Sequence, residues 1–228
     1  MAMLYAAVVS IAGSEYDWVM VRDEDGIQVY LKEYWADKVK AFKGVVQIEA
    51  SIDSLLAVIT DIKACTAWIH HCETQELLLR QSFSECYHYQ LHHLPFPARN
   101  REFIFHTRIR RIPETGEVNI EVQALPEFCT RHSRLCKKIP QYSAIRVQHS
   151  HGSYHLEPLG KKLTRVTWIQ HTDPGGYLPH WVINSLLRNV PFKTLQSLRK
   201  LVKEDKYRTA RMQFNRQGQI ADIKLSVP

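Results

Sequence analysis

The sequence has no apolar run long enough to cross a membrane as a helix, since such a span needs about 18 consecutive apolar residues. Residues 1–14, MAMLYAAVVSIAGS, are apolar and small, but they lack the basic residues with which a secretory signal begins. Two interpretations of this segment are retained. It is either the remnant of an export signal, which would place the protein in the periplasm, or a helix that packs on the domain of a cytoplasmic protein.

The short motifs of the common enzyme classes are also missing. The sequence contains no G-x-S-x-G nucleophile elbow, no H-E-x-x-H motif, and no Walker or dinucleotide-binding glycine pattern. His70 and His71 lie close to Cys65 and Cys72, but this spacing matches no standard zinc site. We therefore expect no metal ion and no other cofactor, and we assign no catalytic residue.

Basic residues exceed acidic residues, 30 to 23, which gives a net charge of +7. This balance favours anionic partners such as lipid headgroups, nucleic acid or acidic proteins. The basic residues are spread over several predicted elements and match no nucleic-acid recognition module. We expect transient contact with an anionic membrane surface and none with nucleic acid.

Cysteine is scarce, and the five cysteines do not fix the compartment. Their odd number leaves at least one thiol free, which argues for a reducing compartment. Against this, Cys65/Cys72 and Cys129/Cys136 have identical spacing, and each pair could close a local loop in an exported protein. The sequence leaves the disulfide state open.

Glycine and proline are few, nine and ten in 228 residues, and no repeat or linker divides the chain. Period-two alternation predicts three strands within residues 16–51. Capping by Ser51 or Asp53, followed by apolar residues at helical spacing, predicts a helix over residues 52–69. Six further strand-like runs, separated by turn signals, cover residues 74–81, 85–94, 101–112, 117–125, 144–159 and 163–172.

The last predicted element is a long helix over about residues 179–205. Strands that are separated from the helices along the chain are typical of an α+β fold. We expect one domain over residues 16–205, preceded by the apolar segment at residues 1–15 and followed by a polar tail at residues 206–228.

The run ECYHYQLHH, residues 85–93, carries bulky or polar side chains on both of its faces. Tyr87 and Tyr89 share one face, whereas His88, Gln90 and His92 share the other. A few polar groups on an otherwise apolar concave surface would orient the polar end of a ligand. The alternative is that these groups face solvent or bind one another.

The stretch HTDPGGYLPHWVINSLL, residues 171–187, joins the last predicted strand to the long helix. Gly175 and Gly176 tolerate a positive φ, and Pro179 suits the first turn of a helix. Pro191 falls inside the helix, and we expect it to kink or divide the helix because it removes one backbone hydrogen bond. A helix of this kind is either a movable cover or a core helix that follows a curved sheet.

Five segments in this order resemble START domains, the lipid-transfer domains related to the steroidogenic acute regulatory protein. They are DEDGIQVY (23–30), KAFKGVVQIEAS (40–51), DIKACTAWI (61–69), LPFPARNREFIF (94–105) and TDPGGYLPHWVIN (172–184). The resemblance implies a helix-grip fold, of the START and Bet v 1-like type. In this fold a curved antiparallel sheet wraps around the C-terminal helix, and an apolar tunnel between them holds one lipid.

The family mostly binds and transfers lipids, such as sterols or phospholipids, without covalent chemistry. The resemblance therefore implies a lipid carrier and not an enzyme. One alternative is an enzyme of cyclase or hydrolase type on the same scaffold, and another is a regulatory module that senses lipid without moving it.

Sterol-binding animal members bury an acidic residue and an arginine as a pair on the strands that flank the loop at residues 94–100. Here His88 stands at about the acidic position and Thr107 or Arg108 near the arginine, so the identity of the lipid is not assigned. Gly175, Gly176 and Pro191 are expected to gate the tunnel. The residues expected to contact the lipid are Trp68, Tyr87, His88, Tyr89, Phe96, Arg101, Phe103, Phe105, Ile120, Val122, Trp168, Trp181 and Leu187.

Overall fold

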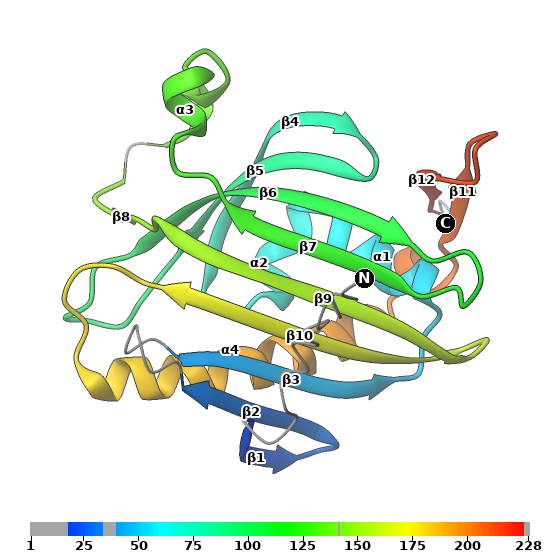
Figure 1. Ribbon diagram of the computed structural model, residues 1–228, viewed down its shortest axis with the longest axis horizontal. Coiled ribbons are helices and arrows are strands. Elements are labelled where there is room, and N and C mark those ends of the chain that lie inside the picture. The colour runs from blue at the N-terminus through cyan, green and yellow to red at the C-terminus, as the bar shows by residue number, and fades with distance from the viewer. Residues whose placement is uncertain (1–17, 34–39, 141, 226–228) are drawn as a thin grey trace, which may run out of the picture.

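The structure is a computed structural model that describes residues 18–33, 40–140 and 142–225. Its main feature is an antiparallel sheet that wraps around a long C-terminal helix (Figure 1). The strands of this sheet are β1 (Val19–Glu24), β2 (Ile27–Glu33), β3 (Lys40–Ile48), β4 (Cys72–Ser82), β5 (Glu85–His92), β6 (Arg101–Arg111), β7 (Val118–Ala124), β8 (Ile145–Arg146), β9 (His149–Gly160) and β10 (Leu163–Asp173).

The strands are ordered β1-β2-β3-β10-β9-β7-β6-β5-β4, and the short β8 pairs in parallel with β6. Most neighbours in the sheet are also neighbours in the chain, and two-residue turns join β1 to β2, β4 to β5 and β9 to β10. At one such turn, Asp25 and Gly26 have φ values of +53° and +69°, and they connect β1 to β2 in the left-handed conformation that two-residue hairpins require. The α+β helix-grip fold predicted from the sequence is confirmed.

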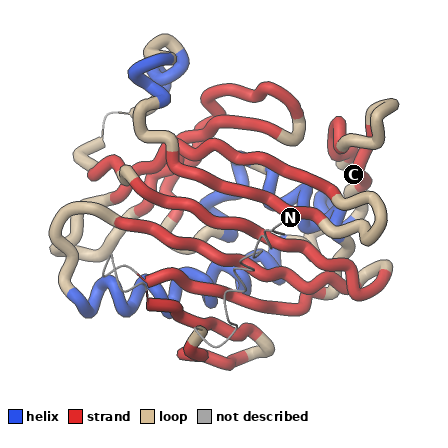
Figure 2. The backbone as a smooth tube through the Cα atoms, viewed as in Figure 1, coloured by secondary structure: helices blue, strands red, loops and turns tan. Residues whose placement is uncertain are grey.

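The helices are α1 (Ile52–Thr60), α2 (Cys65–Trp68), α3 (Phe128–Arg131), α4 (His180–Leu201) and α5 (Asp205–Arg208). Short 3-10 helices are η2 (Ile62–Ala64) and η3 (Leu135–Lys138). Figure 2 shows that α1, α2 and α4 lie on one side of the sheet, whereas α3 stands away from them at one corner. The largest buried apolar cluster joins α1, α2 and the second half of α4 to the strands they cover.

The helix predicted over residues 52–69 is not continuous, and this part of the prediction is wrong. Ser51 caps α1 as expected, since its side chain accepts a hydrogen bond from the Ser54 amide. The chain becomes extended at Asp61 and then resumes as η2 and α2. The Asp61 carboxylate accepts hydrogen bonds from the Lys63 amide and the Tyr207 hydroxyl, so a distant segment stabilises the break.

The second half of α4 packs closely on β2 and β3. A side chain at Gly44 of β3 would place its Cβ 2.7 Å from Leu195 Cδ1 and 3.3 Å from Pro191 Cβ, so glycine permits this approach. Pro191 lies inside α4, but the helix continues through it as one element of 22 residues. The expected division of the helix at Pro191 is therefore not found.

Residues 206–225 do not form the polar tail that the sequence suggested. They contain α5 and a two-stranded hairpin, β11 (Arg211–Phe214) and β12 (Ile220–Lys224). Tyr207 and Ile220 are buried in the main core cluster, and the Met212 amide donates to the Asp53 carboxylate at 3.1 Å. The hairpin lies at the end of the sheet opposite to the start of α4 (Figure 1).

Candidate functional site

A cavity of about 260 Å³ lies between the sheet and the first half of α4. Alternate residues of β5, β6, β7, β9 and β10 form its floor, because every second side chain of a strand faces the same way. Its roof includes four residues of α4 spaced as i, i+3, i+4 and i+7, which places them in one stripe on the helix. These residues are Ile183, Leu186, Leu187 and Val190.

Aromatic rings line the cavity where β9 and β10 meet α2. The rings of Tyr154 and Trp168 are stacked, with centroids 5.0 Å apart. Phe42 meets Trp168 edge-on at 4.7 Å, and Trp68 meets Tyr154 edge-on at 6.3 Å. Burial raises the pKa of the Tyr154 hydroxyl, so this group is uncharged at physiological pH. The result is a wide and largely apolar wall.

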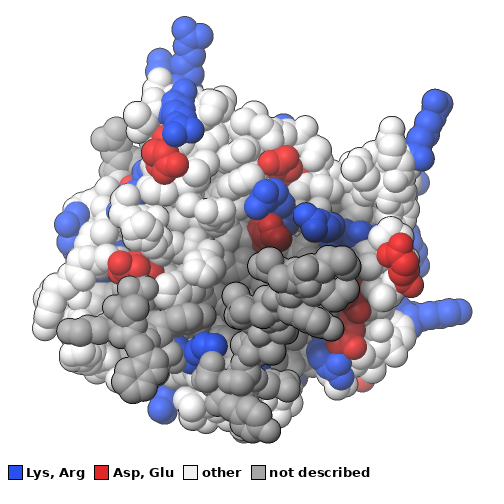
Figure 3. All heavy atoms as spheres, viewed as in Figure 1, with Lys and Arg blue, Asp and Glu red and all other residues white. Residues whose placement is uncertain are grey.

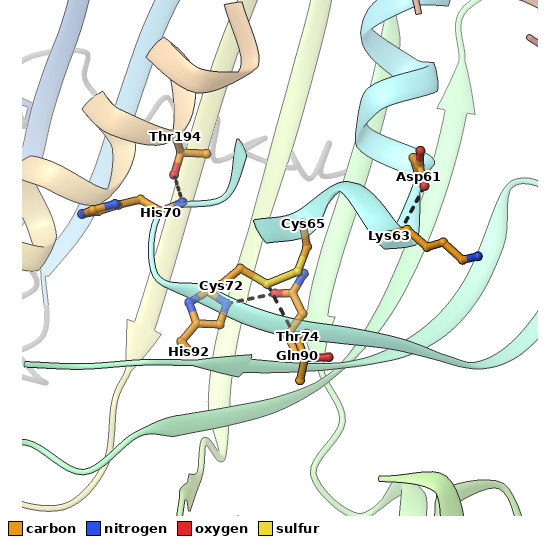
Figure 4. The surroundings of a disulfide bond; sticks show 9 residues. All are labelled: Asp61, Lys63, Cys65, His70, Cys72, Thr74, Gln90, His92 and Thr194. Atoms are coloured by element: carbon orange, nitrogen blue, oxygen red, sulfur yellow. Dashed lines mark hydrogen bonds between the residues drawn. A yellow bond between two sulfur atoms is a disulfide. The ribbon is translucent and has the colours of Figure 1, made fainter. Parts of the chain in front are cut away.

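A row of polar side chains crosses the floor on β5. His88, Gln90 and His92 are spaced by two residues, so all three face the cavity. His92 Nε2 lies 3.1 Å from Gln90 Oε1, and Figure 4 shows these two side chains pointing toward each other. Burial lowers the pKa of His88 and of His92 to about 4, so both imidazoles are neutral at pH 7.

A second polar row on β9 and β10 satisfies its own hydrogen bonds. Ser150 Oγ and Thr172 Oγ1 are 2.7 Å apart, and Gln170 Nε2 donates to Ser150 Oγ at 2.8 Å. Trp168 Nε1 donates to Gln170 Oε1 at 3.3 Å. These groups therefore have little hydrogen-bonding capacity left for a ligand.

Arg101 connects the two loops that meet at one end of the cavity, residues 93–100 and 174–179, and this end is called the mouth below. The residue is 2% exposed, and its guanidinium donates through Nε to the Pro174 carbonyl at 2.6 Å and through Nη2 to the Gly175 carbonyl at 2.7 Å. Its Nη1 donates to the Arg99 carbonyl. Gly175 and Gly176 both have φ of +62°, a conformation that favours glycine. Arg101 thus holds the loop that precedes α4 in a fixed position.

Two disulfides close the two local loops whose state the sequence left open. Cys65–Cys72 joins α2 to the start of β4, as Figure 4 shows, and Cys129–Cys136 joins α3 to η3. Cys86 is free and lines the cavity. Burial raises the pKa of its thiol, so it is a poor nucleophile at neutral pH.

Nine of the thirteen side chains expected to contact a lipid line the cavity. Gly175 and Gly176 lie in the loop before α4, and Pro191 lies against Gly44, outside the cavity. The nine cavity-lining residues are Trp68, His88, Arg101, Phe103, Phe105, Ile120, Val122, Trp168 and Leu187.

The structure places two of the expected residues, Tyr87 and Tyr89, on the outer face of β5. Tyr87 stacks on Phe128 of α3, with centroids 4.8 Å apart, and the Tyr89 hydroxyl donates to Glu102 at 3.1 Å. Because side chains alternate along a strand, they face away from His88 and its cavity neighbours. The segment that contains α3 covers this outer face, so both tyrosines are shielded without contacting the cavity.

Two other expected residues, Phe96 and Trp181, project into solvent. Phe96 is 92% exposed in the loop between β5 and β6, and Trp181 is 58% exposed in the first turn of α4. A third aromatic residue, Tyr177, lies on the loop before α4 and is 88% exposed. Beneath these rings a small buried cluster of Leu94, Leu178 and Val182 joins the two segments.

Several cavity residues were not among those expected from the sequence. Tyr154 and Gln170 lie on the floor, and Ile183 and Leu186 lie on the roof. The period of two in residues 150–154 and 168–172, and the helical spacing in residues 183–190, carry the signal that would have identified them.

Within the described part of the chain, no group of three or more His, Cys, Asp or Glu residues could hold a metal ion. Nor does any described helix have the length and apolar character needed to cross a membrane. On the face in Figure 3, Lys and Arg side chains stand among Asp and Glu side chains, and uncharged surface separates them.

Comparisons with known proteins agree on one family. A model of the START domain matches residues 2–208. An uncharacterized protein of Pseudomonas aeruginosa is 33% identical over 202 residues, which are 87% of this chain and 94% of that protein. The phosphatidylcholine transfer protein of Rattus norvegicus is 27% identical over 178 residues, which are 76% of this chain and 78% of that protein.

Among solved structures, the STAR-related lipid transfer protein of Xanthomonas axonopodis has a TM-score of 0.71 at 27% identity, and the match covers 82% of this chain and 99% of that chain. Human StAR-related lipid transfer protein 5 also has a TM-score of 0.71, at 18% identity, over 84% of this chain and 88% of that chain. The second likeness concerns the fold alone.

Proposed function

The chain belongs to the START domain family, and on this premise we propose that it encloses one lipid molecule in the cavity and carries it between membranes. Lipid binding and transfer in general follow from the family and from its named relatives. The observation that carries the finer proposal is the roof of the cavity, a single apolar stripe of α4 that faces the aromatic wall and the two polar rows of the floor. Each buried CH2 group of a ligand contributes about 0.8 kcal/mol, so such a cavity retains a lipid without a strong polar anchor.

Loading requires the roof to move. The first half of α4 has one fully buried residue, Val182, whereas the second half buries Phe192, Leu195 and Leu198 in the main core. The volume of about 260 Å³ is also slightly below the roughly 300–1,000 Å³ of typical ligand pockets. We therefore expect the first half of α4 to swing outward while the second half stays in place, with the loop at Gly175 and Gly176 as the joint once its hydrogen bonds to Arg101 break.

The exposed aromatic rings at the mouth support docking on a membrane surface. Phe96, Tyr177 and Trp181 lie within two residues of the buried cluster that joins the mouth loop to α4. Aromatic rings favour the membrane–water interface. An aromatic side chain buries roughly 150–250 Å², so inserting half of one ring contributes about 2 kcal/mol, which is about 30-fold in affinity.

Vesicle binding tests the docking surface. The double variant Phe96→Ala/Trp181→Ala is expected to lose at least 30-fold in affinity for vesicles of phosphatidylcholine and phosphatidylserine, from the same insertion estimate of about 2 kcal/mol. Phe214→Ala is the control, because Phe214 is 48% exposed on β11, at the other end of the sheet. If the two variants lost equal affinity for vesicles, the aromatic residues at the mouth would not be the docking surface.

A matched pair of variants on α4 tests lipid carriage. Ile183→Trp fills the cavity from the roof, whereas Asn184→Trp adds the same bulk to the exposed side of the same helix. We expect native mass spectrometry to find one lipid on the wild-type protein and on Asn184→Trp, and a reduced amount on Ile183→Trp. Vesicle-to-vesicle transfer should decrease in the same order. A wild-type protein that is empty and transfers nothing would contradict the proposal.

The same protein preparations and assays also test two alternative functions. A lipid sensor would hold lipid in the mass spectrum but would not accelerate transfer. An enzyme of cyclase or hydrolase type would convert its bound ligand. The imidazoles that line the cavity are those of His71, His88 and His92, of which His88 and His92 lie on β5. Unchanged turnover in His88→Ala and in His92→Ala would exclude both residues as its catalysts.

A further inference from the structure

A lobe on the outer face of the sheet, residues 128–140, lies apart from the cavity. It begins with α3 and contains η3, and the Cys129–Cys136 disulfide closes the chain between them. Its underside is apolar: Phe128 is 2% exposed and stacks on Tyr87 of β5, and other apolar side chains of the lobe pack on the same buried cluster. None of residues 128–140 lines the cavity. The lobe is therefore fixed on the sheet, and its opposite side is accessible to a partner.

The accessible side of this lobe is basic. It carries Arg131, Arg134, Lys137 and Lys138, all of them exposed, and residues 128–140 contain no Asp or Glu, so four basic residues and no acidic one give a formal charge of +4. Lys138 donates to a carbonyl of β4, whereas the other three form no hydrogen bond or ion pair with any residue that the structure describes. Figure 3 shows Lys and Arg side chains projecting from the corner where α3 stands.

Elsewhere on the surface, several exposed arginines have an acidic partner. Arg108 lies 3.2 Å from Glu121, and Arg208 lies 2.7 Å from Asp205. In the lobe, by contrast, like charges are held in and beside one disulfide-closed loop, where they repel one another and contribute nothing to the core. An anionic partner relieves this repulsion. Because the lobe is already fixed, little conformational freedom is lost when the partner binds.

The chain returns from this lobe to the mouth of the cavity. The Ile145 amide of β8 donates to the Asn100 carbonyl of the mouth loop at 2.9 Å. Tyr87, beneath the lobe, is five residues from His92 at the mouth end of β5, which is roughly 17 Å along the strand. The lobe and the exposed aromatic rings at the mouth therefore belong to neighbouring parts of the surface.

The shape of the lobe favours a flat partner. Figure 1 shows α3 standing out from the sheet at one corner, so the basic side chains lie on a projection and not in a groove. Extended peptides bind along free strand edges or in grooves. A bilayer with anionic lipids instead presents many negative headgroups in one plane, and its field reaches about 10 Å into a solution of 0.1 M salt.

We propose that the lobe is a docking site for the anionic headgroups of a membrane surface, and that it acts together with the aromatic rings at the mouth. The inference rests on the proposed function and specifies which membranes the carrier visits. Aromatic rings enter the interface of any bilayer, whereas Arg131, Arg134 and Lys137 are attracted only where the headgroups carry a net negative charge. The lobe thus adds a preference for anionic membranes, and it sets the tilt at which the mouth meets them.

Vesicle binding after removal of the charges tests the inference. The triple variant Arg131→Gln/Arg134→Gln/Lys137→Gln is compared with the wild-type protein on vesicles of phosphatidylcholine alone and on vesicles that also contain phosphatidylserine. Each basic residue near an anionic surface contributes about fivefold in affinity, so the variant should lose about 100-fold on the anionic vesicles and nothing on the neutral ones. Added salt should reduce the affinity of the wild-type protein for anionic vesicles toward that of the variant.

The matched control removes the same number of charges far from the lobe. Lys161 and Lys162 lie in the β9–β10 turn, Lys203 follows α4, and all three are exposed. Lys161→Gln/Lys162→Gln/Lys203→Gln lowers the net charge equally, so it should reduce the affinity for anionic vesicles less than about fivefold. Every substituted side chain is exposed, and we expect both triple variants to keep the Tm of the wild-type protein.

The outcomes separate this inference from the function on which it rests. Equal losses in the two triple variants, or wild-type protein that binds both kinds of vesicle equally, would overturn the inference and leave the mouth and lipid carriage intact. A lobe variant that loses affinity for a polyglutamate peptide but not for anionic vesicles would assign the lobe to an acidic protein, and would also overturn it. Wild-type protein that bound neither kind of vesicle and transferred no lipid would overturn both proposals.

Discussion

Replacement of Arg101 by lysine is expected to loosen the loop that joins β10 to α4. The guanidinium holds this loop through the Pro174 and Gly175 carbonyls and also binds the Arg99 carbonyl in the neighbouring loop. Lysine keeps the positive charge, but its ammonium is a point donor at the end of a flexible stem and cannot span three carbonyls as a planar fork does. The substitution therefore removes at least two of the three hydrogen bonds.

The magnitude follows from the charge of the donor. A hydrogen bond to a charged group contributes about 1.5–3 kcal/mol, so the loss of two destabilises the closed loop by about 3 kcal/mol at the lower limit. This corresponds to an increase of about 150-fold in the open population. If opening of this loop limits exchange, lipid transfer should accelerate, and a bound lipid should dissociate faster.

Amide hydrogen exchange over residues 174–187 measures the opening directly, and vesicle-to-vesicle transfer measures its consequence. Arg99→Lys is the control, because Arg99 is exposed and its side chain makes one long contact, to Ser143 Oγ at 3.4 Å. If Arg101→Lys lowered the Tm while exchange at residues 174–187 and lipid transfer stayed unchanged, Arg101 would stabilise the core without holding the mouth, and the reasoning would be refuted.

Three further predictions concern stability, each measured by urea unfolding. His88 and His92 each have a pKa of about 4 in the folded protein and 6.5 in the unfolded chain, so the unfolded chain binds more protons between these two pH values. The free energy of unfolding should therefore fall by about 3 kcal/mol per histidine as the pH drops from 6.5 to 4. An unfolding free energy that does not change over this pH range would contradict the prediction. Removing the Cys129–Cys136 disulfide by double substitution with serine should cost about 2 kcal/mol for a loop of this length, and unchanged stability would contradict the pairing. Asp61→Asn should lower the free energy of unfolding by about 1–2 kcal/mol, because the Asp61 carboxylate binds both the break after α1 and the segment after α4. A decrease of less than a few tenths of a kcal/mol would show that water replaces those hydrogen bonds.

The strands could be predicted from the sequence because their signal is local. Alternation in the run at residues 101–111 and turn residues such as Asp25-Gly26 depend on neighbours in the chain, and the structure places β6 and the β1–β2 turn there. The break at Asp61 depends on the Tyr207 hydroxyl, which is distant in sequence. Helical spacing on both sides of Asp61 carries no information about that partner, so the sequence predicted one long helix.

The same distinction explains the candidate site. Alternation on β5 assigned Tyr87 and His88 to opposite faces, but it did not reveal which face would be enclosed. The outer face is covered by α3, a helix of four residues at the start of a disulfide-closed loop, and a segment this short has no detectable helical period. Bulky or polar side chains on both faces made the tyrosines resemble cavity residues, although only the face with the histidines lines the cavity.

The exposed position of Trp181 changes how α4 is understood. A ring of this size at the start of an apolar helix suggests a core residue, yet the helix directs its Ile183–Val190 stripe into the cavity and Trp181 into solvent. The first half of α4 is therefore stabilised by whatever fills the cavity, because it has little core of its own. Under the proposed function, a bound lipid stabilises the closed position of this half of α4. Phe96 and Trp181 are already exposed in that position, so a membrane that receives the two rings binds the closed protein, and docking and opening are separate steps.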